Sequence, residues 1–240
     1  MDLADLQAQI SALKEEKYQL LKLVNHDIRS PFNRIFALLQ LFEMEATDIS
    51  GQQRAYLDSM ILSILSGLEM ITNLRDMREI DAGNVVVEKT ELDILPLLHR
   101  CMRTFSKQME LKKITIEIKA SDDEIIILSD EFYVQRVIEN VLSNAVKFSR
   151  LGKKVHVELL KTDKGVEIYV EDAGEGIKVE EEYLLFQKFK KLSNVASGGE
   201  GCLGLGLYNT TYFLQKLGGG ISLIRKEDAG STFMITLPAK

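Results

Sequence analysis

The sequence is poor in cysteine and has no excess of positive charge, and both shortages exclude classes of protein. Cys101 and Cys202 are its only cysteines, and neither lies in a CxxC pair. A disulfide framework and a cysteine-rich zinc site are therefore excluded, and a reducing, cytoplasmic setting fits. Lysine and arginine number 30 against 36 acidic residues, a formal net charge of −6. Nucleic-acid binding needs a basic face, so this charge balance argues against it.

Long apolar runs are also missing. No stretch approaches the roughly 18 apolar residues of a membrane span, so we expect no membrane contact by this segment itself. Residues 1–22 are heavily charged, unlike a secretory signal peptide. What is present is a composition typical of soluble globular protein, with 45% hydrophobic and 28% charged residues. The length of 240 residues fits one large domain or two ordinary ones.

The first 45 residues have helical periodicity. Two apolar positions recur every seven residues at the start, in the series Leu3, Ile10, Lys17 and Val24 and the series Leu6, Leu13 and Leu20. They indicate a short coiled coil with Lys17 as its one polar seam position. A third series overlaps them: Leu21, Ile28, Ile35 and Phe42. The apolar stripe therefore moves round the helix near His26. The alternative is an ordinary amphipathic helix that packs within one chain.

A second helix follows a turn at residues 46–52 and ends near Gly83. Apolar residues at spacings of three and four mark it: Leu57, Ile61, Ile64, Leu68, Ile71 and Leu74. A short loop between long helices makes an antiparallel hairpin. A lone hairpin exposes too much apolar surface, so we predict that two chains pair their hairpins in a four-helix bundle, as a homodimer.

Strand patterns mixed with helical ones follow Gly83. The strand candidates are residues 85–87, 114–118, 125–128, 155–159, 166–170, 221–224 and 233–237, and the helix candidates are 92–110, 132–148 and 205–217. This order predicts an α/β sandwich, in which a sheet carries helices on one face. We therefore expect a helical hairpin in residues 1–82 and an α/β domain in residues 83–240.

His26 lies off the apolar stripe of the first helix. Asp27 follows it directly, and Pro31 removes a backbone donor and crowds the carbonyl of Asp27. The sequence thus weakens one helical turn beside an exposed imidazole with a carboxylate next to it. On this stretch alone, a surface histidine on a kinked helix is the simpler interpretation.

Two stretches of the α/β domain carry polar residues suited to a nucleotide. Asn140 and Asn144 share one helix face with Lys147 one turn on, and an amide oxygen with an ammonium can hold a magnesium ion and a phosphate. Asp172 stands at a strand end, where a carboxylate can accept a hydrogen bond from an exocyclic amine. Gly174 and Gly176 after it let the backbone approach a flat ring. A structural role for the helix face, and a capped glycine turn at Asp172, are the alternatives.

Two further stretches suit phosphate. Residues 177–196 are long and polar, with aromatic anchors and lysines, which is typical of a lid, although a solvated face has the same charge pattern. Residues 198–207 form a glycine-rich turn that opens a helix and presents free backbone N–H groups. Gly199, Gly201 and Gly204 match the dinucleotide fingerprint literally. We reject that interpretation, because the turn does not directly follow a strand and lies near the end of the chain.

Taken in order, these stretches resemble the histidine kinases of two-component signalling. His26-Asp27-x-Arg29-x-Pro31 is similar to the H box, Asn140-x-x-x-Asn144-Ala145-x-Lys147-Phe148 to the N box, Asp172-x-Gly174-x-Gly176 to the G1 box, Phe186-x-x-Phe189 to the F box, and Gly204-Leu205-Gly206-Leu207 to the G2 box. Five boxes in family order form a specific signal, and they favour a functional His26 over a structural one.

The resemblance implies a fold and an activity. Residues 1–82 would be a coiled-coil lead-in and a dimerisation and phosphoacceptor hairpin. Residues 83–240 would be a Bergerat-type ATP-binding domain of the GHKL class, with a mixed sheet and a lid at about 177–203. ATP would phosphorylate His26, with Asp27 orienting the imidazole and taking up its proton. The phosphoryl group would then pass to an aspartate in the receiver domain of a response regulator.

The resemblance also implies the nucleotide site. Asp172 would bind the adenine amino group beside Gly176, and Asn144 would coordinate Mg²⁺. The other implied nucleotide-binding residues are Asn140, Lys147, Phe148, Gly174, Phe186, Lys188, Phe189, Gly201, Gly204, Leu205 and Gly206. An upstream sensor domain or sensor protein would supply the input, either to a soluble kinase or to the cytoplasmic part of a membrane-anchored one.

Two residues depart from the family pattern. Cys202 stands where the first glycine of the G2 box is expected, which would weaken ATP binding if the backbone there must approach phosphate. Ser30 stands where members with strong phosphatase activity usually carry threonine or asparagine. It keeps a hydroxyl, so phosphatase activity stays open. Two alternatives to an active kinase remain: a catalytically weak nucleotide-binding scaffold of the same fold, and another GHKL ATPase that works as a clamp.

Overall fold

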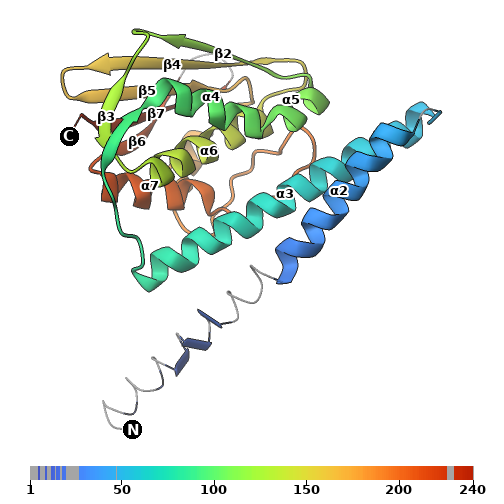
Figure 1. Cartoon of the computed structure of the whole chain (residues 1–240), viewed down its shortest axis with the longest axis horizontal. Coiled ribbons are helices and arrows are strands. Elements are labelled where there is room, and N and C mark those ends of the chain that lie inside the picture. Colours follow the sequence, from blue (N-terminus) through green and yellow to red (C-terminus); the bar gives the residue numbers. More distant parts are fainter. Residues whose placement is uncertain are drawn as a thin grey trace. The chain divides into compact units, whose positions relative to one another are not determined.

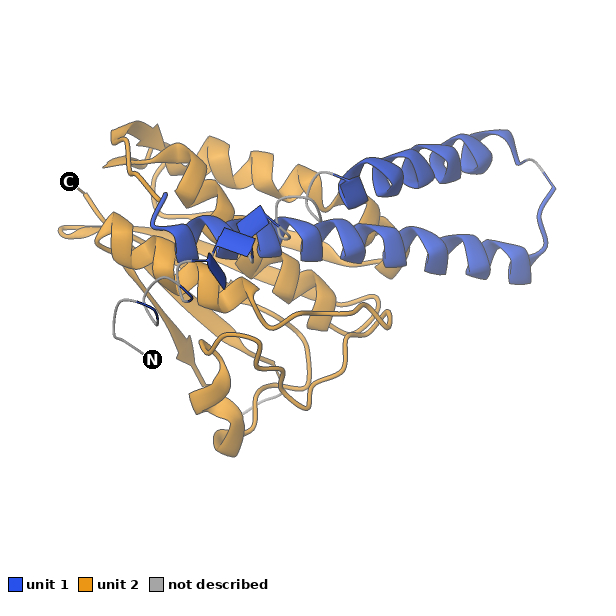
Figure 2. Cartoon of the chain, turned by 90° about the horizontal axis from the view of Figure 1, so that it is seen from below, with its two compact units in different colours: residues 1–84 blue, residues 85–240 orange. Residues whose placement is uncertain are grey.

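The computed structural model describes residues 5, 9, 12–13, 15–16, 18–19, 27–46, 48–225 and 230–239. The chain divides into two compact units, residues 1–84 and 85–240 (Figure 2). The described positions between 5 and 19 are helical. Most of the predicted coiled-coil positions, and His26 itself, lie outside the described residues.

Unit 1 contains the predicted helical hairpin. Its helices are α2, Arg29–Glu45, and α3, Gly51–Ala82, which pack against each other along the hairpin (Figure 1). A capping box starts α3: the Ser50 hydroxyl accepts from the Gln53 amide at 3.2 Å, and the Ser50 amide donates to the Gln53 side chain at 2.7 Å. Gly83, with a φ of 72°, ends the helix in the left-handed conformation.

A close approach and an ion-pair cluster join the two helices. Gly67 faces the ring of Phe32 so closely that a Cβ on Gly67 would lie 2.2 Å from the Phe32 Cε1 atom. Near the turn, the Arg54 guanidinium lies 2.5 Å from Glu43 of α2 and 3.1 Å from Asp58 of α3. The absence of a side chain at Gly67 therefore lets α2 lie close against α3.

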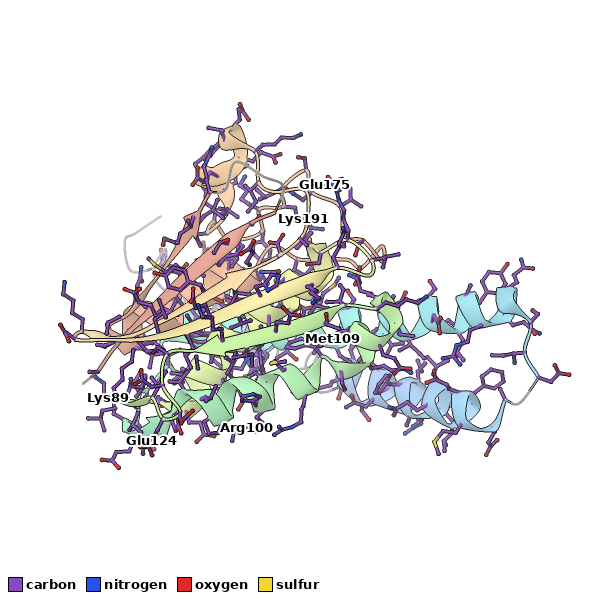
Figure 3. The ribbon with its side chains drawn as sticks, turned by 90° about the horizontal axis from the view of Figure 1, so that it is seen from above. Lys89, Arg100, Met109, Glu124, Glu175 and Lys191 are labelled. Carbon is purple, nitrogen blue, oxygen red and sulfur yellow. The ribbon has the colours of Figure 1, made fainter. Side chains whose placement is uncertain are left out.

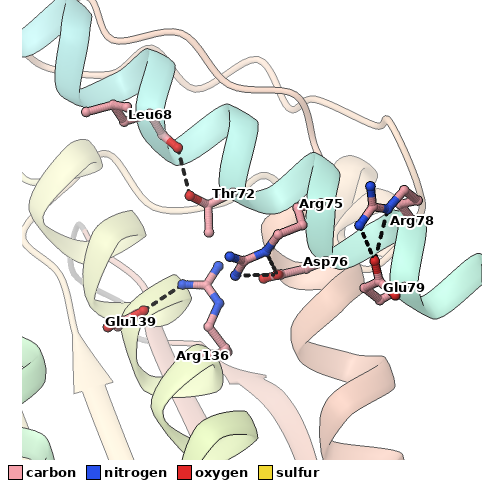
Figure 4. Close-up of polar contacts among 8 residues, drawn as sticks. All are labelled: Leu68, Thr72, Arg75, Asp76, Arg78, Glu79, Arg136 and Glu139. Atoms are coloured by element: carbon pink, nitrogen blue, oxygen red, sulfur yellow. Dashed lines mark hydrogen bonds and ion pairs between the residues drawn. The ribbon is translucent and has the colours of Figure 1, made fainter. Parts of the chain in front are cut away.

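The polar side chains in the second half of α3 find partners within the same helix (Figure 4). The Thr72 hydroxyl donates to the Leu68 carbonyl at 2.8 Å. Arg75 pairs with Asp76 at 3.2 Å, and Arg78 pairs with Glu79. Among the described helices, α3 is the one whose length and mean hydropathy would suit a membrane crossing, and core helices of water-soluble proteins have the same character. The apolar character of α3 is hard to recognise in the sequence, because charged residues interrupt its apolar runs.

The helix α2 leaves much of its apolar surface exposed and buries no residue fully. Its exposed apolar side chains are Ile35, Leu38, Leu41, Phe42 and Met44. We predicted that the hairpin pairs with a second copy because a lone hairpin exposes apolar surface of this kind.

Unit 2 is built on a five-stranded mixed sheet with the strand order β2-β4-β5-β7-β6 (Figure 1). Its strands are β2 (Thr115–Ala120), β4 (Lys154–Thr162), β5 (Gly165–Glu171), β6 (Gly220–Ile224) and β7 (Thr232–Pro238). The pair of β2 and β4 is parallel and the other pairs are antiparallel. A separate antiparallel pair joins β1, Thr90–Asp93, to β3, Ile126–Ser129. The expected mixed sheet is thus confirmed.

Helices cover one face of this sheet, as Figure 1 shows. They are α4 (Ile94–Thr104), α6 (Glu131–Phe148) and α7 (Gly206–Leu217), and the short α5 (Ser106–Lys112) follows α4. The alternating residues of the central strands are buried under them, among them Leu159, Ile168 and Ile235. The period-two pattern of the sequence therefore identified the core face correctly.

Two predicted elements of unit 2 are wrong in detail. Residues 85–87 are not a strand. Val85 is buried, and the amide of the following Glu88 donates to the Asp130 carboxylate, 2.8 Å away, rather than to a neighbouring strand. Residues 92–110 do not form one helix. The chain turns at buried Phe105, with φ −100° and ψ 4°, and the Thr104 hydroxyl donates to the Cys101 carbonyl at 2.6 Å. Burial of the Phe105 ring thus outweighs continuous helical propensity.

Candidate active site

Asp172 occupies a buried position at the end of β5, where the chain passes close to the start of β7. Its Oδ1 atom accepts hydrogen bonds from the Gly174 amide at 2.8 Å and from the Ser231 amide at 3.2 Å. The Asp172 amide in turn donates to the Ser231 carbonyl at 2.9 Å. Two backbone donors thus fix one carboxylate oxygen, and the Ser231 side chain also hydrogen-bonds the carboxyl group.

Burial raises the pKa of the Asp172 carboxyl above that of an ordinary aspartate. The hydrogen bonds from Gly174 and Ser231 lower this pKa, but the effect of burial is larger. A carboxylate in this position is therefore poorly solvated near neutral pH, and a hydrogen-bond donor on a ligand would stabilise it.

Thr232 is a candidate site residue that the sequence alone did not indicate. Its side chain is buried, and its hydroxyl has no hydrogen-bond partner in the structure. It directly follows Ser231, which donates to Asp172, and it pairs with Glu171 in the register of β5 and β7. A buried hydroxyl without a partner is rare in folded proteins and suits a polar ligand atom. In the sequence, Thr232 is indistinguishable from a threonine chosen for its strand propensity.

Glycines allow the backbone segments to meet around Asp172. A Cβ on Gly174 would lie 2.8 Å from the Phe148 carbonyl, and a Cβ on Gly230 would lie 2.4 Å from the Asp172 carbonyl. Gly176 has a φ of 79°, which favours glycine. Three segments therefore meet closely here: the end of α6, the loop after β5 and the start of β7. Glycines in such a cluster suit the binding of a flat ring, because they let the backbone approach it.

The polar face of α6 lies beside the start of α7. Asn140 is buried, and its Nδ2 atom donates to the Gly206 carbonyl at 3.4 Å. Asn144 is half-buried and Lys147 is buried. Within the described part of the chain, no three His, Cys, Asp or Glu side chains form a metal-binding group. A magnesium site at Asn144 therefore stays a prediction that depends on amide and phosphate oxygens.

The predicted lid, at about residues 177–203, contains the 3₁₀ helix η2, Val179–Leu184. Its aromatic segment is joined to the glycine turn before α7. The Phe189 amide donates to the Gly204 carbonyl at 2.9 Å, and both residues have positive φ, 62° and 69°. Phe186 is half-buried, and Leu205 is buried. The Lys188 ammonium lies 5.3 Å from the centre of the Tyr208 ring. Figure 3 places Glu175 and Lys191 on the side of unit 2 away from Lys89 and Glu124.

Gly204→Ala should disrupt this junction. A Cβ on Gly204 would lie 2.1 Å from the Lys190 carbonyl oxygen, so the backbone itself would have to move. Gly199→Ala is the matched control: its φ of 74° is equally strained, but nothing lies within 4 Å of the added Cβ. We expect ATP affinity to fall by about tenfold or more in Gly204→Ala and much less in Gly199→Ala. Equal affinities in a calorimetric titration would contradict this.

The two cysteines should differ in reactivity. Burial raises the pKa of the Cys101 thiol to about 12, with a smaller contribution from the charge of Glu139. Cys202 is half-exposed between Gly201 and Leu203. Because the thiolate is the reactive form, an alkylating reagent at about pH 8 should label Cys202 in the folded chain and Cys101 only after unfolding. Mass spectrometry of the labelled peptides checks this, and prompt labelling of Cys101 would contradict it.

The phosphoacceptor stretch is described only in part. Asp27 and Ile28 form a π-helical turn just before α2, so the helix departs from regular α geometry beside Pro31, as the sequence predicted. The side chains of Asp27 and Ser30 are exposed. His26 is outside the described residues, so its role stays a prediction from the sequence.

Comparison with known proteins supports the division into two parts. Residues 16–83 match the His Kinase A (phospho-acceptor) domain, and residues 129–240 match the histidine kinase-, DNA gyrase B- and HSP90-like ATPase family. The curated relatives include the hybrid signal transduction histidine kinase B of Dictyostelium discoideum, 28% identical over 95% of this chain, and the histidine-protein kinase BarA of Escherichia coli K12, 28% identical over 97%. The chain spans only 12% and 26% of the lengths of these two proteins.

Solved structures show the same fold. Full-length ShkA, determined in complex with AMPPNP, matches 92% of this chain and 45% of its own, with a TM-score of 0.64 and 24% identity. The mycobacterial sensor histidine kinase MprB matches 64% of this chain and 99% of its own, with a TM-score of 0.55 and 25% identity. The two domain matches, in this order, establish that the chain belongs to the sensor histidine kinases: it carries a phosphoacceptor domain followed by an ATP-binding catalytic domain.

Proposed function

We propose that this chain is a kinase core that uses ATP to phosphorylate His26 and passes the phosphoryl group to an aspartate of a separate response regulator. The observation that carries the nucleotide half of the proposal is the pairing at the end of β5. A buried Asp172 carboxylate has one oxygen fixed by two amides, beside a buried Thr232 hydroxyl without a partner. The match to the His Kinase A domain over residues 16–83 favours a kinase over an ATPase clamp.

The residues at this position fit an adenine ring. The second oxygen of Asp172 would accept from the exocyclic amine, and the Thr232 hydroxyl would hydrogen-bond a ring nitrogen directly or through water. Gly176 would allow the backbone to lie against the ring. The implied phosphate-side residues, with Asn140, Asn144 and Lys147 on α6 and Lys188 and Gly201 in the lid, would then face the triphosphate.

Magnesium, bound through Asn144 and the phosphate oxygens, would neutralise charge on the transferred group. The chain itself contributes positioning and proton transfer. A neutral ring nitrogen of His26 attacks the γ-phosphorus, a P–N bond forms, and the P–O bond to ADP breaks. The imidazole proton passes to the carboxylate of Asp27, which also orients the ring.

The partners follow from the same assignment. Residues 1–82 would form the dimerisation and phosphoacceptor hairpin, and the exposed apolar side chains of α2 would pack in a four-helix bundle with a second copy. Residues 83–240 would be the catalytic domain, with the lid at about 177–203. A receiver domain would accept the phosphoryl group, a sensor domain or protein would supply the signal, and the core would work in the cytoplasm. The exposed Ser30 would hold the phosphatase position.

Thr232→Val tests the adenine pocket with little change in shape. Valine replaces the buried hydroxyl by a methyl group, so a hydrogen bond to the ligand is lost while the packing volume is kept. We expect ATP affinity to fall by about tenfold, the usual effect of one buried hydrogen bond or two. Thr236→Val, on the same strand, is the control, since the Thr236 hydroxyl instead donates to the Gly220 carbonyl at 3.4 Å. Equal ATP affinities for the two variants in a calorimetric titration would show that the Thr232 hydroxyl does not contribute to ATP binding.

A further inference from the structure

A buried ion pair connects the body of unit 2 to the base of the lid. Lys112, the last residue of α5, is among the large side chains that are fully buried in the described part of the chain, and only 1% of its surface is exposed. Its ammonium donates to the Glu200 carboxylate at 2.8 Å and to the Lys147 carbonyl at 2.8 Å. The Glu200 side chain is 6% exposed. This pair lies outside the nucleotide-binding residues predicted from the sequence, and it joins residues 88 positions apart.

The second oxygen of Glu200 holds the glycine turn in which it stands. It accepts from the Gly198 amide at 2.9 Å. Two more bonds fix the residue before this turn, since the Ser197 amide and hydroxyl donate to the Lys147 carbonyl at 3.1 and 3.3 Å. Residues 197–200, the lid base, are therefore tied to the end of α6 by Ser197 directly and by Glu200 through Lys112.

The carbonyl at the centre of this cluster is chemically suited to a cation. It belongs to the last turn of α6, where carbonyls lack helical donors and carry the negative end of the helix dipole. The Lys112 ammonium is a third donor to this carbonyl, beside the amide and the hydroxyl of Ser197. Lys112 thus neutralises two groups at once, a helix end and a lid carboxylate.

Stability alone does not account for this arrangement. Burial lowers the pKa of Lys112, and the Glu200 carboxylate opposes that shift. A buried ion pair often contributes less to stability than an apolar pair of the same volume, because both charges lose their hydration. Its clearest effect is on geometry, because the pairing of Lys112 with Glu200 fixes the position of the lid base before any ligand binds.

We propose that Lys112 and Glu200 are positioning residues, which hold the lid base in the conformation that receives the phosphates of ATP. The inference rests on the proposed function and adds a role for two residues outside the five boxes. A lid base already ordered loses less conformational entropy on binding, so the pair contributes to affinity without touching the ligand. This contribution to affinity should be larger for ligands with more phosphates, because Lys147 and Gly201, the implied phosphate-side residues, adjoin the cluster. Binding of the adenine ring depends instead on Asp172.

The test compares Lys112→Met, Glu200→Gln and the double variant with the unmodified chain. Calorimetric titrations use adenosine, ADP and a non-hydrolysable ATP analogue, and hydrogen exchange follows the amides of residues 197–201 without nucleotide. We expect the affinity for the ATP analogue to fall by about tenfold in Lys112→Met. The affinity for adenosine should stay unchanged, exchange in the lid base should become faster, and the double variant should be no worse than Lys112→Met. Glu200→Gln keeps an acceptor for Lys112 and should have a smaller effect in the same direction.

Lys107→Met is the matched control, since Lys107 lies on the same helix and pairs with Glu110 at the surface, 3.3 Å away. It should bind all three ligands normally. Equal loss of affinity for adenosine and the ATP analogue would show a merely structural role and overturn the proposal, and so would unchanged affinity despite faster exchange. If the unmodified chain binds none of the ligands, the proposed function itself fails. If Lys112→Met does not fold, the same comparison with Glu200→Gln decides.

Discussion

Asp172→Asn should weaken ATP binding by about 100-fold while leaving the nucleotide-free chain at least as stable as before. Asparagine keeps an oxygen for the Gly174 and Ser231 amides, so the loop after β5 can stay as it is. Its other atom becomes an NH₂ donor, which would face the donor of the adenine amine. The site would then lose a charge-assisted hydrogen bond and gain a repulsion between two donors.

The stability half of this expectation follows from the raised pKa of the Asp172 carboxyl. A carboxyl whose pKa is higher in the folded state than in the unfolded state favours folding below its unfolded pKa. That contribution is lost as the pH rises through the folded pKa. Near neutral pH the ionised side chain is therefore a net cost to the nucleotide-free fold, and the neutral asparagine removes it. The thermal midpoint without nucleotide should stay equal or rise, and the increase that ATP produces should disappear.

Asp163→Asn is the control, because it makes the same substitution in the exposed turn between β4 and β5. It should change neither the midpoint nor its response to ATP. If Asp172→Asn binds ATP normally and lowers the midpoint, Asp172 only caps a glycine turn, which is the structural alternative to a nucleotide site.

Sequence periodicity predicted the large elements well for a physical reason. The alternation around Ile168 and the three-and-four spacing around Val141 record which face of each element is buried, and that face is what tertiary packing uses. The same reasoning failed at Phe105, where one buried ring ends a helix, and at residues 85–87, where no strand partner is present. Those outcomes depend on contacts distant in sequence.

Candidate site residues could be proposed from the sequence where a motif has an unusual composition. Asp172 and its glycines form such a motif, and so do Asn140 and Asn144 on one helix face. Thr232 could not be found in this way, since only the structure shows its hydroxyl buried without a partner. The pair of Lys112 and Glu200 was equally invisible, because nothing in the sequence marks two charged residues as buried together.

His26→Gln should eliminate phosphorylation of the chain altogether. Glutamine has a similar size, but its amide nitrogen is not a nucleophile, so no P–N bond can form. Nucleotide binding should be unaffected, because every residue assigned to the adenine and phosphate positions belongs to unit 2. His99→Gln is the control: His99 is exposed on α4, where its Nδ1 atom lies 2.9 Å from the Leu95 carbonyl. That variant should be phosphorylated like the unmodified chain.

The most direct measurement is therefore the acid-labile label that each chain retains after incubation with γ-labelled ATP and magnesium. The account predicts label on the unmodified chain and on His99→Gln, and none on His26→Gln, with ATP bound by all three. Acid-labile label that persists in His26→Gln would contradict the assignment of the phosphoacceptor. ATP hydrolysis without any labelled protein would indicate an ATPase clamp, and the absence of nucleotide binding would indicate a scaffold.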